Sequence, residues 1–274
     1  MDKNGSYKLL YEEMFIVKYN RVVSVFLVTI MLVSINCVNV FAANLKQNEI
    51  PLEMAPGTVI QFDDNNTPII TAKVSFDSTP ILLPKEWSEE DDKKLADEEA
   101  FLESVYKEAE KYPVVELKNP IPCPGMIVTY GIDGGILNIK YPESSSTKGM
   151  LPQGTRKPPG TYKYPANKNT QKITITSSAV TGEGRFTVFN DSIGDHGNYL
   201  KTGDVATKGE IDNPWYGTKL DTRALNTNVA KVMTKNDCGS LPEAVLDVWK
   251  WSGTMYGYTY SSTLSFPGRY YYQF

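Results

Sequence analysis

Two aspartates near the C-terminus are the residues best suited to acid–base chemistry. Asp237 lies beside Cys-Gly in the segment NDCGSLPEAVLDVW, and Asp247 follows ten positions later in an apolar run. Apolar neighbours disfavour a charged carboxylate, so we expect the pKa of Asp247 to be raised, whereas Asp237 should stay hydrated and ionised. Two carboxyl groups in unlike environments can divide the acid and base roles of glycoside cleavage.

The same two residues also have a structural interpretation. Asp237 suits an Asx turn, and Asp247 suits a cap on the element after the preceding strand. The residue types therefore leave two hypotheses open, a catalytic pair and two capping side chains.

The sequence gives little support for catalysis by a metal ion, a serine triad or a cysteine nucleophile. His196 is the only histidine, which excludes a multi-histidine metal site. Its turn-forming neighbours and the absence of a G-x-S-x-G motif favour a loop residue over a member of a Ser-His-Asp triad. Cys238 would need His196 as its base to act as a nucleophile. No phosphate-binding glycine loop is present, so we predict no metal and no cofactor.

Residues 1–42 are typical of a secretory signal peptide. Basic residues precede the apolar run VVSVFLVTIMLV, and Val40 and Ala42 supply the small residues of a cleavage site after Ala42. An uncleaved membrane anchor is the alternative, because about 20 apolar residues span a bilayer. Both interpretations place the body of the protein outside the cytoplasm, either secreted or associated with the cell wall.

The cysteines and the charge set further limits. Cys123 and Cys238 remain after such cleavage, in a compartment that permits oxidation, and form either one long-range disulfide or two separate thiols. The net charge of -4 gives no indication of nucleic-acid binding.

Residues 43–141 are predicted to form a small α+β region of unknown role. Alternating β-branched residues predict a strand over 67–77. Ser88, followed by acidic residues, marks the start of an acidic amphipathic helix, whose apolar stripe either packs or binds a partner. Apolar runs around Asp133-Gly134-Gly135 predict a hairpin over 126–141.

Residues 142–172 are rich in Pro, Gly, Ser and Lys and are predicted to be a basic linker. Its cations would either hold an anionic cell-wall polymer, weakly because salt screens them, or keep a spacer soluble. These cations are Lys148, Arg156, Lys157, Lys163, Lys168 and Lys172.

Residues 173–274 read as short strands with turns, which predicts a compact β barrel or sandwich. The whole chain is therefore expected to be mainly β with an α+β N-terminal region. Tyr256, Tyr258 and Tyr260 recur at a period of two, which would place their rings on one face of a strand, near Trp249 and Trp251. Such rings either stack on sugars or fill a small barrel.

Four short motifs follow one another in this C-terminal part. They are Trp215-Tyr216-Gly217-Thr218, the alternating strand 229–233, Asp237-Cys238-Gly239 with Pro242 nearby, and Leu246-Asp247-Val248. In this order they resemble the RlpA-like double-psi β-barrel domains of septal lytic transglycosylases, expansins and barwin-like proteins. The resemblance implies a six-stranded double-psi β-barrel over 173–274, with Asp237 and Asp247 as its catalytic residues.

The resemblance also suggests substrate contacts. The segment GDVATKG is similar to the one that brings a threonine to the groove of this fold, which implies Thr207. Asp212, in EIDNPWYGT, stands where lytic transglycosylases of this family carry a histidine. An aspartate-only pattern is closer to expansins, which loosen glycans without hydrolysis. Trp249, Tyr256 and Tyr258 are the expected aromatic contacts.

We therefore predict a secreted wall protein that remodels peptidoglycan or a related cell-wall polysaccharide. Lytic transglycosylation would use a proton from Asp247 or Asp237 while a sugar hydroxyl closes on the anomeric carbon. A non-catalytic, expansin-like module that binds or loosens wall polymer is the alternative, and a barrel that binds another protein is a third possibility.

Overall fold

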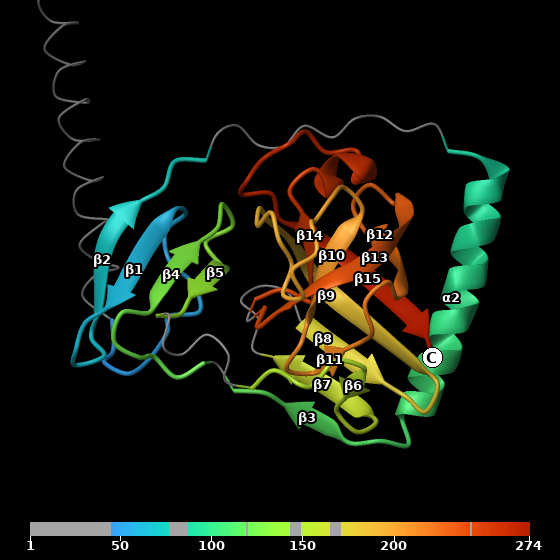
Figure 1. Cartoon of the computed structure of the whole chain (residues 1–274), viewed down its shortest axis with the longest axis horizontal. Coiled ribbons are helices and arrows are strands. Elements are labelled where there is room, and N and C mark those ends of the chain that lie inside the picture. Colours follow the sequence, from blue (N-terminus) through green and yellow to red (C-terminus); the bar gives the residue numbers. More distant parts are fainter. Residues whose placement is uncertain (1–44, 77–86, 119, 143–148, 165–170, 242) are drawn as a thin grey trace, which may run out of the picture. The chain divides into compact units, whose positions relative to one another are not determined.

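The computed structural model describes residues 45–76, 87–118, 120–142, 149–164, 171–241 and 243–274. Residues 46–274 belong to one compact unit, which is mainly β (Figure 1). The predicted signal peptide, 1–42, lies outside the described residues. Over the described part of the chain, no helix combines the length and hydrophobicity needed to cross a lipid bilayer.

A four-stranded antiparallel sheet forms from the first half of the chain, in the order β2-β1-β4-β5. The predicted hairpin is confirmed: Asp133 accepts a hydrogen bond from the Gly135 amide at 3.0 Å, and Gly134 adopts the positive φ that its turn requires. The predicted strand at 67–77 is also confirmed. The strands are β1 (Thr58–Phe62), β2 (Pro68–Lys73), β4 (Ile127–Tyr130) and β5 (Ile136–Lys140).

A nine-stranded sheet has the order β14-β10-β13-β12-β15-β9-β8-β7-β3. Beside it, two short strands, β6 (Thr155–Arg156) and β11 (Asp212–Asn213), pair with each other. The strands of the large sheet are β3 (Val114–Glu116), β7 (Gly160–Tyr164), β8 (Gln171–Ile175), β9 (Ala179–Phe189), β10 (Asp204–Lys208), β12 (Lys219–Ala224), β13 (Ala230–Gly239), β14 (Leu246–Trp249) and β15 (Phe266–Gln273).

Six strands of this sheet close into a ring of pairings, because the long strand β9 has two partners along one edge. Its first half pairs with β8, its second half pairs with β14, and its other edge pairs with β15. The ring therefore runs β9-β14-β10-β13-β12-β15 and back to β9. Apolar side chains such as Phe186, Val205, Leu220, Met233 and Leu246 form its buried core.

The pairings of the ring have an internal symmetry. The pairs β9–β14 and β10–β13 are parallel, and the other four pairs are antiparallel. Exchanging β9 with β13, β10 with β14 and β12 with β15 reproduces every pairing and its direction. The two halves of the ring are thus topologically equivalent.

The acidic helix is confirmed as α2 (Glu89–Ala109), with Ser88 as its N-cap in a capping box with Asp91. It packs on the large sheet through its apolar stripe, in which Leu102, Val105 and Ala109 are buried. Phe101 also contacts Tyr271 of β15, with ring centroids 4.9 Å apart.

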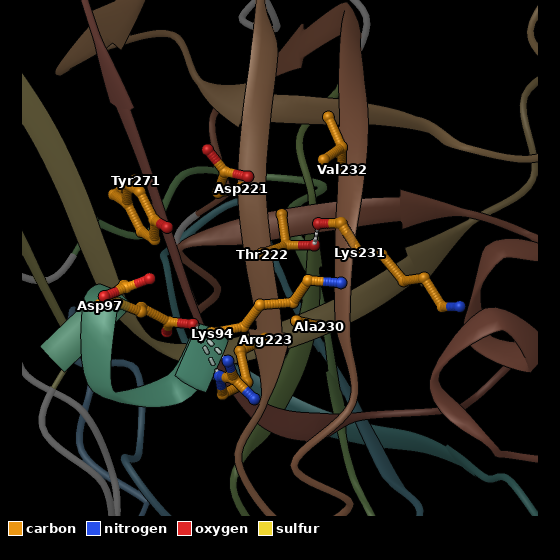
Figure 2. A pocket seen from close by; sticks show the side chains of 10 residues that line it. Lys94, Asp97, Asp221, Thr222, Arg223, Ala230, Lys231, Val232 and Tyr271 are labelled. Carbon is orange, nitrogen blue, oxygen red and sulfur yellow. Dashed lines mark hydrogen bonds and ion pairs between the residues drawn. The ribbon is translucent and has the colours of Figure 1, made fainter. Parts of the chain in front are cut away.

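One acidic residue of α2 is buried against the ring. Glu98 pairs with Arg223 at 2.6 Å and with Arg269 at 2.6 Å. This cluster borders a pocket of about 420 Å³ where α2 meets β12, β13 and β15; Figure 2 shows Arg223 and Tyr271 beside the helix. The charges at this pocket hold the helix on the sheet.

The predicted linker over 142–172 is wrong where the structure describes it. Strand β7 lies between β8 and β3, and its Tyr162 and Tyr164 are buried. The segment has almost no aliphatic residues, but alternating tyrosines provide the buried face of β7. Residues 143–148 and 165–170, including Lys148 and Lys168, lie outside the described residues.

The remaining cations of that segment have partners within the fold. Arg156 lies 3.6 Å from Asp212, Lys157 over the Tyr162 ring, Lys163 3.9 Å from Glu116, and Lys172 3.2 Å from Glu183. These cations therefore do not form a free basic linker. The boundary at residue 141 is likewise wrong, because β3 belongs to the nine-stranded sheet and α2 packs on it.

The two sheets contact each other through a buried arginine. Arg185 of β9 donates a hydrogen bond to the Ile136 carbonyl at 2.9 Å and forms an ion pair with Asp133. Both partners belong to the β4–β5 hairpin, so this contact fixes the hairpin beside β9.

We predict that Glu98→Gln lowers the free energy of unfolding by about 3 kcal/mol, because it leaves two guanidinium groups without their carboxylate in a buried setting. Urea unfolding of the purified chain measures the change. The matched control is Glu90→Gln, which removes an exposed ion pair with Lys94 on the same helix and should leave stability unchanged. Equal stability of both variants would contradict the proposed role of Glu98.

Candidate functional site

Strand pairing places four residues in one row across the ring. Ala206 of β10 pairs with Asp237 of β13 on one side and with Asp247 of β14 on the other. Asp247 in turn pairs with Thr187 of β9. Because neighbouring strands lie about 4.8 Å apart, the Cα atoms of the two aspartates are separated by about 10 Å.

The row faces away from the buried core of the ring. Leu246 and Val248, on either side of Asp247, both belong to the core cluster, and successive side chains of a strand point to opposite faces. Asp247 therefore lies on the outer face. There its carboxylate accepts a hydrogen bond from the Thr187 hydroxyl.

A polar groove of about 660 Å³ runs over Asp247 and Thr187. Strands β4 and β5 provide one wall, and the segments after β9 and before β15 provide the other. Its side chains offer hydrogen-bonding groups, two lysines and two aromatic rings, Phe189 and Tyr260, in addition to Asp247. These include Asn138, Lys140, Asn190, Asp191, Lys250, Tyr260, Ser262 and Thr263.

Burial is the main cause of the high pKa of Asp247, which is raised to about 7. The negative charges of Asp237 and Asp191 raise this pKa further. The prediction of a raised pKa from apolar neighbours is confirmed. At neutral pH a substantial fraction of this carboxyl group is protonated and able to donate to a ligand in the groove.

Asp237 is less hydrated than predicted. It lies near the end of β13 instead of in a turn, and burial raises its pKa to about 6. Its carboxylate accepts a hydrogen bond from the Asp195 amide at 3.0 Å, a contact that lowers the pKa. The two aspartates thus differ less than the sequence indicated, and Asp237 does not line the groove.

The capping interpretation does not describe these aspartates. Asp247 lies inside β14 and bonds to a side chain of β9. Asp237 accepts its bond from Asp195, which is 42 positions away along the chain, so it does not make a local Asx turn with this partner.

Thr207 and Asp212 are not in the groove, contrary to the sequence-based prediction. Thr207 is fully buried, and its neighbour Ala206 occupies the place in the row. Asp212 is fully buried and accepts hydrogen bonds from the Tyr272 hydroxyl at 2.8 and 2.7 Å. Burial raises the pKa of Asp212 to about 6, against the lowering effects of Tyr272 and Arg156.

Two of the predicted aromatic contacts are core residues. Tyr256 and Tyr258 are buried in the ring core, so the barrel-filling alternative holds for them. The predicted strand is wrong: Tyr256 belongs to a 3-10 helix, η2 (Ser252–Tyr256), which ends at Gly257 with φ of 86°, and Tyr258 and Tyr260 follow outside any named strand. Trp249 is partly buried in β14, where its indole N–H donates to the Asp191 carbonyl at 2.8 Å; it does not line the groove.

The histidine and cysteines lie outside the groove lining. His196 is in an exposed loop, as predicted, with its ring stacked on Tyr216 at 3.8 Å. Burial and the nearby Asp195 raise the pKa of Cys238 to about 12, which disfavours a reactive thiolate. Cys123 and Cys238 are both free thiols, so the disulfide alternative is not realised here.

Thr187 is the site residue that the sequence did not reveal. It belongs to the segment GRFTVFN, whose strand-like pattern does not show its neighbours, because the position opposite Asp247 depends on a pairing between residues 60 positions apart. Alternation could have suggested that Thr187 faces away from the core beside Phe186. It could not have identified the strand beside it.

Among the described residues, no group of His, Cys, Asp and Glu side chains suits a metal ion. No protein-family model matches the chain, and neither a known protein nor a solved structure gives a significant match. The geometry and chemistry of the groove must therefore carry any functional conclusion.

We predict that a carboxyl signal in ¹³C NMR titrates near pH 7 and disappears in Asp247→Asn. In Asp237→Asn the midpoint should move to lower pH, because a negative charge that raises the pKa of Asp247 is gone. If the signal that Asp247→Asn removes titrated below about pH 5, the assignment of Asp247 as a proton donor would be wrong.

The same pKa has a consequence for stability. Between about pH 4 and 7, folded Asp247 holds a proton that the unfolded chain has released, so its contribution to stability falls as the pH rises through this window. Chemical unfolding at pH 5 and pH 8 should show a larger loss for the wild type than for Asp247→Asn. An identical loss in both proteins would contradict the shift.

Proposed function

We propose that this protein acts on peptidoglycan or a related cell-wall glycan, with Asp247 as the general acid of a lytic transglycosylase. The observation that carries the proposal is a half-protonated carboxyl group at the base of a polar groove. Active sites are where burial and like charges shift carboxyl pKa values in this way. The groove is of a size typical of small-molecule sites.

A double-psi β-barrel is the fold we propose for the ring. Support comes from its six strands, its two parallel pairs and the exchange symmetry of its halves. The order of the sequence motifs fits this topology, since Asp237 and Asp247 come from β13 and β14 on either side of β10.

The proposed reaction needs one carboxyl group. Asp247 donates its proton to the glycosidic oxygen as the bond from this oxygen to the anomeric carbon breaks. A hydroxyl of the same sugar then bonds to the anomeric carbon and returns its proton to the Asp247 carboxylate. The products are a shortened chain and an anhydro sugar, and Asp247 is protonated again.

Other residues would support this step from fixed positions. Thr187 bonds to Asp247 and orients it, while Asp237 and Asp191 keep its pKa high. Lys140 and Lys250 also line the groove and suit the carboxylates that peptidoglycan carries, which favours it over a neutral polysaccharide.

A non-catalytic wall-binding or wall-loosening module is the second candidate. The observation in its favour is that neither Asp237 nor His196 lines the groove, so Asp191 is the one other carboxylate beside Asp247 among the groove residues that the structure describes. In both cases the proposal includes export by the N-terminal segment 1–42.

We predict that the purified protein releases soluble anhydro-muropeptides from peptidoglycan and that Asp247→Asn abolishes this release. Activity should fall about tenfold per pH unit above pH 7, because only protonated Asp247 can donate. Mass spectrometry of the soluble products measures both effects.

The control is Asp221→Asn, which changes an exposed aspartate beside α2 and should leave release unchanged. Pelleting with peptidoglycan without release would favour the binding module. The absence of both release and pelleting would contradict the proposal and point to a protein partner.

A second variant tests the orienting contact. Thr187→Val keeps the shape of the side chain but removes the hydroxyl that bonds to Asp247, so release should slow about tenfold or more while pelleting with peptidoglycan is retained. Thr187→Ser should restore most of the rate. A valine variant as active as wild type would show that this hydrogen bond has no role in the reaction.

A further inference from the structure

A tilted pair of aromatic rings includes one ring that lines the groove. Trp251 and Tyr260 have ring centroids 4.1 Å apart and an interplanar angle of 33°. Tyr260 lines the groove together with Asp247. The two residues are 46% and 43% exposed, whereas Tyr256 and Tyr258 between them in the chain are buried.

The backbone holds this pair in place. The Trp251 carbonyl accepts bonds from the Thr254 amide at 3.1 Å and from its hydroxyl at 2.7 Å, which fixes the start of η2. The adjacent Ser252 is buried and accepts a bond from the Gly203 amide at 2.9 Å. Tyr260 lies in the short segment between two core residues, Tyr258 and Leu264. Such preorganisation lowers the entropic cost of ligand binding.

The chemistry of the surroundings indicates a sugar. Large exposed aromatic surfaces often mark interaction sites, and an aromatic ring can stack on the apolar C–H face of a pyranose. The groove around Tyr260 offers hydroxyl and amide groups from Asn138, Asn190, Ser262 and Thr263, which suit sugar hydroxyl and acetamido groups. A ring face surrounded by such groups fits an amphipathic carbohydrate ring better than a purely apolar ligand.

We infer that Trp251 and Tyr260 form a pyranose-stacking subsite that positions one sugar of a glycan chain next to the bond cleaved at Asp247. This inference rests on the proposed function. The stacked ring would set the register of the chain in the groove, so that the glycosidic oxygen reaches the carboxyl group.

The test uses the full chain and soluble glycan strands prepared from peptidoglycan. Trp251→Ala and Tyr260→Ala should each weaken the Kd about tenfold, as expected for the loss of one aromatic contact. Tyr260→Phe should bind like wild type, because stacking needs the ring and not the hydroxyl. Tyr199→Ala is the matched control, since Tyr199 is 83% exposed and is not part of the groove lining. Calorimetry measures binding, and thermal unfolding confirms that each variant is folded.

The possible results of this experiment distinguish a failure of the subsite from a failure of the proposed function. If the wild type binds the strands and both alanine variants bind them equally well, the subsite is wrong and the proposed function is unaffected. Equal weakening by Tyr199→Ala also overturns the subsite, because the effect would then be general. If the wild type neither binds nor cleaves the strands, both the subsite and the proposed function fail.

Discussion

Strand β14 closes the ring, and the arrangement of the site depends on this closure. One edge of β14 pairs with β10 and the other with β9. Asp247 is therefore held between Ala206 and Thr187, its partners on the two neighbouring strands. Leu246 and Val248 are buried in the core. A shift of the β14 register by one residue would therefore move them to the outer face and move Asp247 into the core. The same burial that stabilises the strand fixes the direction of the carboxyl group.

This constraint links stability with chemistry. The desolvation that raises the pKa of Asp247 disfavours its charged form, so the folded chain is less stable at alkaline pH than a neutral side chain would make it. Such a cost is expected at a functional site, and Asp212 shows that it also occurs in the core, where Tyr272 and Arg156 partly offset the effect of burial. The contrast is Glu98, a buried acid with two arginine partners, where charge is compensated and holds α2 on the sheet.

Local patterns predicted several of the individual elements. The capping box at Ser88 and the turn at Gly134 involve neighbours in sequence, so their physics is visible without the fold. The predictions failed where composition misled. Tyr162 and Tyr164 replace aliphatic residues on the buried face of β7, and the composition of this strand is therefore typical of a linker. Alternation at Tyr256 and Tyr258 suggested a strand, although Tyr256 is the last residue of a 3-10 helix and Tyr258 follows its C-cap, Gly257.

The sequence by itself determined that Asp247 lies in an apolar strand, because Leu246 and Val248 alternate with it. The burial and the negative charges of Asp237 and Asp191, which raise its pKa, come from the fold. Only the tertiary structure decided which residues share its row. Thr187 and Ala206 lie beside Asp247 because distant segments of the chain pair as strands. The threonine that contacts Asp247 is Thr187 and not Thr207, because Thr187 pairs with Asp247 on the outer face of the ring whereas Thr207 is fully buried. Periodicity describes one strand at a time and carries no information about which strands become neighbours, because closure of the ring is a property of the whole chain.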